Sequence, residues 1–181
     1  QAVEDGVRGF KVICDHFEPG DKRALPVYRA IARARTPMLF HSGILWDGKP
    51  SSQFCRPVLF ESLLDVEGLV FALAHISWPW CDELVAVYGK LLNALGRGGG
   101  ASTEMYVDLT PGTPPIYRRD ALTRLLKTGY DIEDNLLFGT DCETSSYNAG
   151  WAREWLERDR GIYDELGVPV QVINRSPAQL T

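Results

Sequence analysis

The chain has 181 residues and a formal net charge of −5, from 19 basic and 24 acidic side chains. Hydrophobic residues make up 45% of it and charged residues 24%, a composition typical of a folded domain and not of a disordered one. The acidic balance excludes general nucleic-acid and membrane-surface binders, because both need a basic face. No stretch approaches the roughly 18 apolar residues of a membrane span, and nothing resembles a signal peptide.

Cysteine usage favours a reducing, cytoplasmic location. The four cysteines are widely spaced and form no C-x-x-C pair, which argues against a zinc ribbon or a redox motif. Two disulfides are arithmetically possible, but a chain of this size with a normal core does not need them. These cysteines are Cys14, Cys55, Cys81 and Cys142.

Short apolar runs alternate with amphipathic segments along the chain. The opening residues before Gly9 read as the end of a helix, and Pro after Thr36 ends the first full helix. Predicted strands, in chain order, cover residues 9–13, 38–41, 69–75, 105–109 and 136–139. Predicted helices cover residues 25–35, 57–64, 81–95, 118–128 and 152–166, with a turn at 97–101 and a short helix after Val170.

The predicted strands are apolar throughout and do not alternate, which is typical of parallel strands covered by helices. They recur about every 30 residues, the length of one βαβ unit. The sequence therefore predicts an α/β fold. The pattern alone does not decide between a closed barrel and an open sheet.

Polar residues stand where the predicted strands end. His41 and His75 close two neighbouring strands, and Asp141 follows the last one. In a parallel α/β sheet the carboxyl ends of the strands meet at one mouth, where ligands bind. Imidazole and carboxylate groups suit zinc or a similar divalent ion, and a neutral histidine can transfer protons near neutral pH. Lys11 lies within the first strand, as a ligand or an ion-pair partner, and His16 lies in a loop.

Four motifs resemble the amidohydrolase superfamily, and within it the amidohydrolase 2, or decarboxylase-like, branch. They are residues 9–11 (GFK), 37–43 (PMLFHSG), 74–83 (AHISWPWCDE) and 137–141 (LFGTD). They resemble strands four, five, six and eight of that family, with residues 105–110 in place of strand seven and the tail up to Ala178 like the closing helices. The resemblance implies a single partial domain over residues 1–181, the C-terminal part of a TIM-type (β/α)8 barrel with strands 4 to 8.

The resemblance also implies roles for the residues at the strand ends. His41 corresponds to a metal ligand, Asp141 to a ligand that also shuttles a proton, and His75 to a catalytic or second metal-site residue. The metal would be zinc, with manganese as the other candidate. Two features depart from the family: Ser77 stands where a glycine is usual, and the chain has no His-x-His pair of the kind that the family's first strand supplies.

Five predicted strands and two candidate zinc ligands are fewer than a complete barrel enzyme needs. An eight-stranded barrel takes about 250 residues, and five strands cannot close it. The first strand would then be an exposed apolar edge. A catalytic zinc takes three protein ligands, and His41 and Asp141 are two. We therefore expect this chain to be the C-terminal part of a longer enzyme. Its N-terminal barrel segment, with strands 1–3, would be a separate chain, a removed segment or a part outside this sequence, and the enzyme would be inactive without it.

The expected function is metal-dependent hydrolysis, in which a metal-activated water attacks an amide, ester or lactone carbonyl of a small molecule. A non-oxidative decarboxylase of the same branch and a non-catalytic binding or scaffold fragment are the alternatives. An open-sheet enzyme that uses Asp141 without metal is a further reading, although no glycine-rich phosphate loop follows the first strand. The resemblance also raises the possibility of a homodimer.

Several loop residues could shape the binding site for an aromatic or carboxylated substrate. The aromatic residues that follow strands could wall a planar molecule, or could pack only within their loops. Arg56 could pair with a substrate carboxylate, although a solvated arginine is the default. The aromatic candidates are Trp46, Trp78, Trp80 and Tyr147.

Overall fold

The computed structural model describes residues 2–96 and 102–168, which form one parallel sheet flanked by helices. The strands are β1 (Phe10–Val12), β2 (Met38–Phe40), β3 (Val70–Leu73), β4 (Glu104–Asp108) and β5 (Leu136–Leu137). The α-helices are α1 (Leu25–Arg33), α2 (Cys81–Gly96), α3 (Pro115–Lys127) and α4 (Ala149–Leu166). The 3-10 segments are η1 (Ser52–Cys55), η2 (Pro57–Asp65), η3 (Ala74–Ser77), η4 (Glu133–Asn135) and η5 (Thr144–Ser146).

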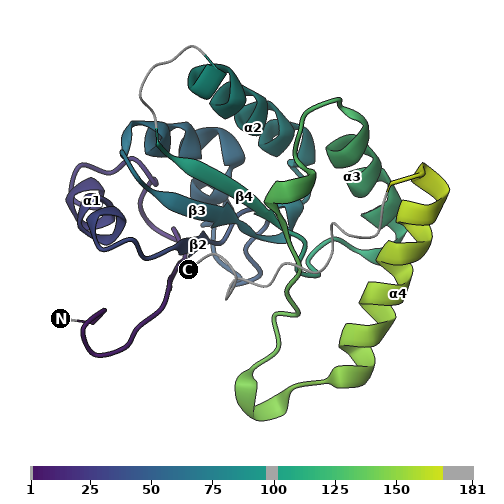
Figure 1. Ribbon diagram of the computed structural model, residues 1–181. Coiled ribbons are helices and arrows are strands. Elements are labelled where there is room, and N and C mark those ends of the chain that lie inside the picture. The colour runs from purple at the N-terminus through teal and green to yellow at the C-terminus, as the bar shows by residue number, and fades with distance from the viewer. Residues whose placement is uncertain (1, 97–101, 169–181) are drawn as a thin grey trace.

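The five strands lie in the order β1-β2-β3-β4-β5, so each strand pairs with its neighbour in sequence, and every pair is parallel. Figure 1 shows the sheet running from β2 to β4 with a helix after each of these strands. Phe40 lies opposite both Val12 and Leu73, so the carboxyl ends of the first three strands are level. Parallel strands that pair in sequence order are the arrangement found in a (β/α) barrel.

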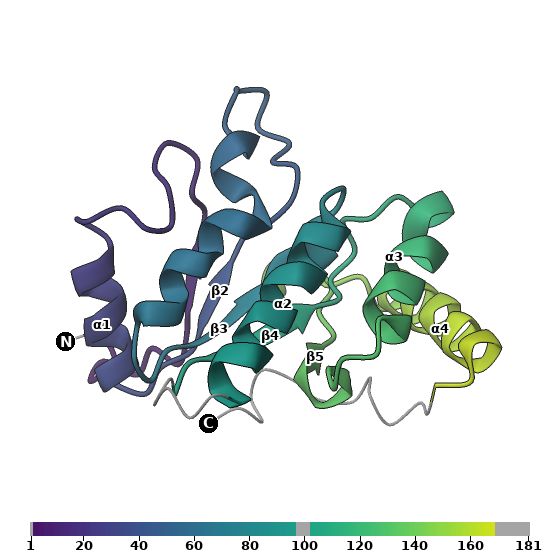
Figure 2. The ribbon, with the colours of Figure 1, turned by 90° about the horizontal axis from the view of Figure 1, so that it is seen from above.

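Alternate strand residues build the core between the sheet and the helices. Phe40 on β2 is fully buried, and its ring meets Tyr28 of α1 and Phe60 of η2 edge-on, with centroids 5.4 Å apart in both pairs. Leu73 of β3 and Val107 of β4 continue this layer with no exposed surface. Figure 2 shows α1, α2 and α3 on the same side of the sheet.

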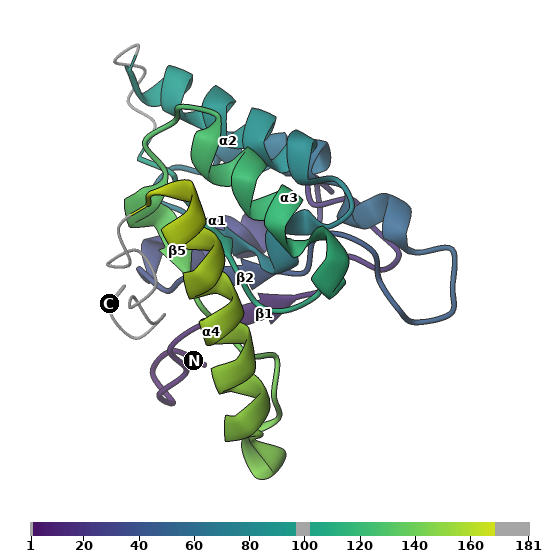
Figure 3. The same cartoon turned by 90° about the vertical axis from the view of Figure 1, so that its right-hand side faces the viewer.

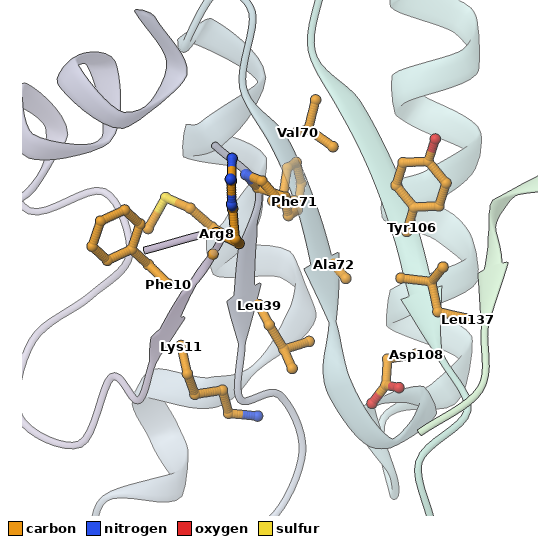
Figure 4. A pocket seen from close by; sticks show the side chains of 13 residues that line it. Arg8, Phe10, Lys11, Leu39, Val70, Phe71, Ala72, Tyr106, Asp108 and Leu137 are labelled. Carbon is orange, nitrogen blue, oxygen red and sulfur yellow. The ribbon is translucent and has the colours of Figure 1, made fainter. Parts of the chain in front are cut away.

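The opposite face of the sheet carries a cavity of about 540 Å³. Figure 4 shows Leu39, Ala72 and Leu137 along it, with Lys11 and Asp108 pointing into it from β1 and β4 near the carboxyl ends of the strands. Apart from these two charged residues the strands are largely apolar on both faces, while the described helices cover only one. A face of this composition is typical of a barrel interior, which side chains from further strands fill.

A buried ion pair fastens α4 to α3 at the β5 end of the sheet, where Figure 3 shows the two helices side by side. The Arg118 guanidinium donates to both carboxylate oxygens of Asp159, at 2.8 and 2.6 Å, and to the Leu109 carbonyl at 2.7 Å. Neither side chain of the pair has any exposed surface. Arg118 therefore ties the loop after β4 to α4.

The helix and strand order matches the sequence prediction, with local differences at residues 2–6 and 69–75. Residues 2–6 form turns and not the end of a helix, with Gly6 at φ 97°. The predicted helix at 57–64 is present as the 3-10 helix η2. The predicted strand 69–75 ends at Leu73, because the residues from His75 onward adopt left-handed backbone angles that cannot continue a strand.

Other sequence expectations lie partly outside the described residues. The predicted turn at 97–101 and the helix after Val170 fall there.

All four cysteines are free thiols. Among residues 2–96 and 102–168, no helix has the length and apolar character to cross a membrane.

Candidate functional site

A pocket of about 370 Å³ opens at the carboxyl ends of the strands and brings the three predicted site residues together. His41 follows β2 directly, His75 lies in η3 just after β3, and Asp141 lies four residues beyond β5. The two imidazole rings have centroids 5.1 Å apart. Lys11 of β1 lines both this pocket and the cavity on the face of the sheet opposite the helices. The pocket therefore combines two imidazoles, a carboxylate and an ammonium group.

The loops that carry the two histidines are joined by buried hydrogen bonds. The Ser77 hydroxyl lies 2.7 Å from that of Ser42, which donates to the Cys55 carbonyl at 3.2 Å. The Ile44 amide donates to the Trp78 carbonyl at 3.0 Å. A Cβ on Gly43 would lie 2.5 Å from that same carbonyl oxygen, so only glycine allows the loops to approach this closely.

The turn that carries His75 is strained. His75, Ile76 and Ser77 have φ angles of 62°, 48° and 52°, in the left-handed region that L-residues rarely occupy. For the β-branched Ile76 this conformation is particularly costly. Ile76 is fully buried in the core, and its packing compensates for part of the strain. Backbone strain of this kind is concentrated at functional sites.

Burial keeps the two imidazoles neutral. It lowers the pKa of His41 to about 4, and the nearby His75 and Lys11 act in the same direction, whereas the bond to the Ile44 carbonyl and Asp141 oppose the shift. Burial also lowers the pKa of His75, against the attraction of Asp108. The pKa of Lys11 is lowered by the same cause, again opposed by Asp108 and Asp141. At neutral pH both rings are therefore uncharged, and each offers one N–H donor and one acceptor nitrogen.

A cluster at the end of β4 supports His75, and the sequence analysis assigned it no role. Thr110 donates to one carboxylate oxygen of the buried Asp108, Oδ1, at 2.7 Å. A Cβ on Gly112 would lie 2.7 Å from His75 Nδ1, and one on Gly139 would lie 2.2 Å from the Thr110 hydroxyl. An acidic residue that ends an apolar strand is the signal that could have drawn attention to Asp108.

Of the other loop residues that could shape a binding site, two tryptophans line the pocket, and Arg56 and Trp80 lie outside it. Trp46 and Trp78 line the pocket, and Trp46 is 78% exposed. Arg56 pairs with Glu83 and stacks over Trp80, 5.1 Å from the ring centroid, and neither Arg56 nor Trp80 lines the pocket.

Tyr147 and His16 also lie apart from the pocket. Tyr147 is exposed on the loop before α4. His16 is exposed and hydrogen-bonds to its neighbour Asp15. Neither residue therefore shares the surroundings of the two buried imidazoles.

The pocket can contribute to a metal site but does not form one from the described residues. His41 and Asp141 have the chemistry of zinc ligands. Within residues 2–96 and 102–168, however, no group of three His, Cys, Asp or Glu side chains is placed to hold an ion. His41 Nε2 already lies 3.2 Å from the Ile44 carbonyl oxygen. A catalytic zinc needs three protein ligands, so these residues do not fit a complete metal site.

The described strands and helices form part of a TIM-type barrel with a pocket at the carboxyl ends of the strands, and comparisons with known proteins agree with this fold. An uncharacterised TIM-barrel protein from Bordetella bronchiseptica superposes with a TM-score of 0.57 at 17% identity, over 91% of this chain and 60% of that one. The chain thus spans less than two thirds of that barrel. The family model "Amidohydrolase" matches residues 1–166, and the chain belongs to that family. No curated protein matches.

Proposed function

We propose that this chain contributes the catalytic histidine, the acidic residue and part of the metal site of a metal-dependent hydrolase that acts on a small amide, ester or lactone. The observation that carries the proposal is the convergence of His41, His75 and Asp141 on one pocket at the carboxyl ends of parallel strands. Family membership supports the same class of reaction. The position agrees with the general location of active sites in barrel enzymes.

Each side chain has a role that its surroundings allow. Asp141 is exposed at the pocket rim, where it can take the proton of an attacking water. His75 is buried and neutral, so it can hydrogen-bond a substrate carbonyl oxygen and stabilise the developing negative charge. His41 and Asp141 would supply two ligands to zinc or manganese, with further ligands from outside the described residues.

Further strands complete the site in this proposal. The face of the sheet opposite the helices is mostly apolar and holds a cavity of about 540 Å³, and the barrel superposed above is longer than this chain. Three strands added to five give the eight of a TIM barrel. We expect these strands to fill the cavity and to bring the missing ligands toward His41.

Two substitutions on adjacent β2 residues test barrel completion. In this chain alone L39D should cost less than about 1 kcal/mol, because Leu39 is only half-buried, whereas F40D should unfold the protein. In a polypeptide that includes the complementing strands, L39D should become as damaging as F40D. An equally mild L39D in the longer polypeptide would show that nothing covers the face of the sheet opposite the helices.

Activity is tested by assaying hydrolysis of p-nitrophenyl acetate and of a panel of amides and lactones, with zinc or manganese added and the bound metal measured by mass spectrometry. The assay uses the polypeptide that carries the complementing strands. D141N and H75Q should each lower kcat at least 100-fold, while H16Q, a surface histidine variant, should retain activity. Stoichiometric metal without turnover of any of these compounds would favour a binding or scaffold role.

Decarboxylation is the second candidate. Trp46 and Trp78 beside the Lys11 ammonium give the pocket aromatic walls and a cation, which suit an aromatic carboxylate. His75 or Asp141 would then protonate a ring carbon before carbon dioxide leaves. Release of carbon dioxide from hydroxybenzoates, with no cleavage of esters or amides, would favour this reaction over hydrolysis.

A further inference from the structure

Two aromatic rings from different segments stack on each other beside the pocket. Trp78 lies between η3 and α2, and Tyr117 lies in the first turn of α3. Their ring centroids are 5.8 Å apart, and the ring planes are inclined by 27°. Offset stacking at such a separation is a favourable arrangement for aromatic side chains. Trp78 is among the aromatic residues that the sequence singles out, whereas Tyr117 is not.

Trp78 stands between two pockets. It lines the pocket that holds His41, His75 and Asp141, and it also lines a smaller pocket of about 200 Å³ at the starts of α2 and α3. Of the described residues that line either pocket, Trp78 is the one common to both, and Tyr117 lines only the smaller pocket. Tyr117 therefore stacks on the side of the indole away from His75, which leaves the other side to the larger pocket.

The backbone beneath both rings is held in place. The Trp78 amide donates to the His75 carbonyl at 3.1 Å, and the Trp78 carbonyl accepts from the Ile44 amide at 3.0 Å. Tyr117 precedes the fully buried Arg118, whose ion pair with α4 anchors this turn of α3. The backbone bonds leave the side-chain torsions of the indole free, and the stacked Tyr117 ring restricts its plane.

Aromatic surface next to the pocket is exposed to solvent. Trp46, which also lines the larger pocket, is 78% exposed, and Tyr117 is 50% exposed. The bond from Ile44 to Trp78 brings the loop of Trp46 next to that of Trp78. Exposed apolar surface around a pocket is typical of a ligand-binding site. An indole with an uncovered face favours a planar aromatic ligand over a saturated one of the same size.

We propose that Trp78 is the specificity-determining wall for an aromatic ring of the substrate, and that Tyr117 is the positioning residue that keeps the indole plane against this ring. This inference rests on the proposed function, because the wall belongs to the same pocket. The substrate would be an aromatic amide, ester or lactone. Its ring would lie along Trp78 while its carbonyl reaches His75, which belongs to the same hydrogen-bonded turn.

Equilibrium binding of benzoate and cyclohexanecarboxylate tests the proposal without turnover. The two anions have the same charge and a similar size, neither contains a bond that hydrolysis breaks, and only benzoate has an aromatic face. In ligand-observed NMR titrations of the polypeptide with the complementing strands, benzoate should bind about 3- to 10-fold more tightly, which is the usual strength of an aromatic pair. Equal dissociation constants for the two anions would overturn the proposal.

Variants separate positioning from folding, because general destabilisation weakens both ligands equally and leaves the ratio of their dissociation constants unchanged. Y117L keeps an apolar side chain without a ring and should bring this ratio to within about twofold of one. Y117F restores the ring and should retain the wild-type ratio. The matched control is Y147L, at an exposed tyrosine that lines neither pocket, which should also retain it.

W78L removes the wall itself and should bring the ratio near one. An unchanged ratio in W78L would overturn the wall, and an unchanged ratio in Y117L would overturn the role of Tyr117. Should W78L not fold, the wild-type ratio and the Y117L ratio still decide the question.

The failure of this inference can be told apart from failure of the proposed function. If the ratios are as expected but no amide, ester or lactone is cleaved, then the aromatic wall exists and the proposed reaction is wrong. If hydrolysis depends on His75 and Asp141 as expected while the wild-type ratio is one, then the proposed function stands and the aromatic wall does not.

Discussion

The Ser77 and Ser42 hydroxyls lie 2.7 Å apart, and Ser42 donates to the Cys55 carbonyl at 3.2 Å, which leaves Ser77 as the donor of the bond between the two serines. Both serines are fully buried. This chain of bonds joins the residue that follows His41 to the strained turn that carries His75. Ser77 stands where the family usually has a glycine. Its hydroxyl finds a hydrogen-bond partner, Ser42, on the neighbouring loop.

The direction of these bonds predicts unequal effects of removing the two hydroxyls. S77A leaves Ser42 bonded to Cys55 and should lower the free energy of unfolding by about 0.5–1.5 kcal/mol, whereas S42A leaves the buried Ser77 hydroxyl without its partner and should cost about 1–3 kcal/mol. The double variant should cost less than the sum of the two. Urea unfolding measures all three, and equal costs for S42A and S77A would contradict the assigned direction.

Gly112 is the position at which a single methyl group should disturb His75 most directly. G112A places a Cβ 2.7 Å from the ring, so the loop or the histidine must move, at about 1–3 kcal/mol. The matched control is G161A in α4, where a Cβ meets nothing within 4 Å and alanine should stabilise the helix by about 0.5–1 kcal/mol. Thermal unfolding and the His75 ¹⁵N resonances report the two effects, and an unperturbed His75 in G112A would refute the close approach.

The buried pair Arg118–Asp159 should dominate the docking of α4. D159A leaves an unpaired guanidinium in the core and should cost about 3–5 kcal/mol, while R118M with D159L should restore much of that loss. The control is Arg119–Glu165, which joins the same two helices but is more than half exposed, so that E165A should cost at most about 1 kcal/mol. Chemical denaturation measures the three variants, and comparable costs for D159A and E165A would show that the buried pair is not what holds α4.

The sequence predicted the order of elements because apolar runs and amphipathic stripes directly encode which segments are buried. It placed His41, His75 and Asp141 at strand ends, and the structure brings all three to one pocket. It could not predict that His75 lies in a left-handed turn, since Ile76 and Ser77 have no intrinsic preference for that conformation and tertiary packing imposes it. The cluster around Asp108 was missed for a similar reason, because Gly112 and Gly139 reveal their roles only through what a side chain there would hit.

The lowered pKa of His41 predicts a loss of stability in acid. The unfolded ring binds a proton below about pH 6.5, whereas the folded ring does so only near pH 4. The unfolded state therefore binds more protons between these values, and the free energy of unfolding should fall as the pH is lowered from 6.5 to 4, with the loss complete below. Allowing for partial solvent screening, protonation of this histidine should lower the free energy of unfolding by about 1–3 kcal/mol over that pH range.

Urea unfolding across pH 4–7.5 measures this contribution. H41Q has no imidazole to protonate and can still donate to the Ile44 carbonyl, so its unfolding free energy should depend less on pH than that of the wild type. H16Q removes an exposed imidazole outside the pocket and should retain the wild-type slope. The buried His75 also has a lowered pKa and adds to that slope, so H41Q should reduce it without abolishing it. Identical slopes for H41Q and wild type would show that the His41 ring is not desolvated in the folded protein.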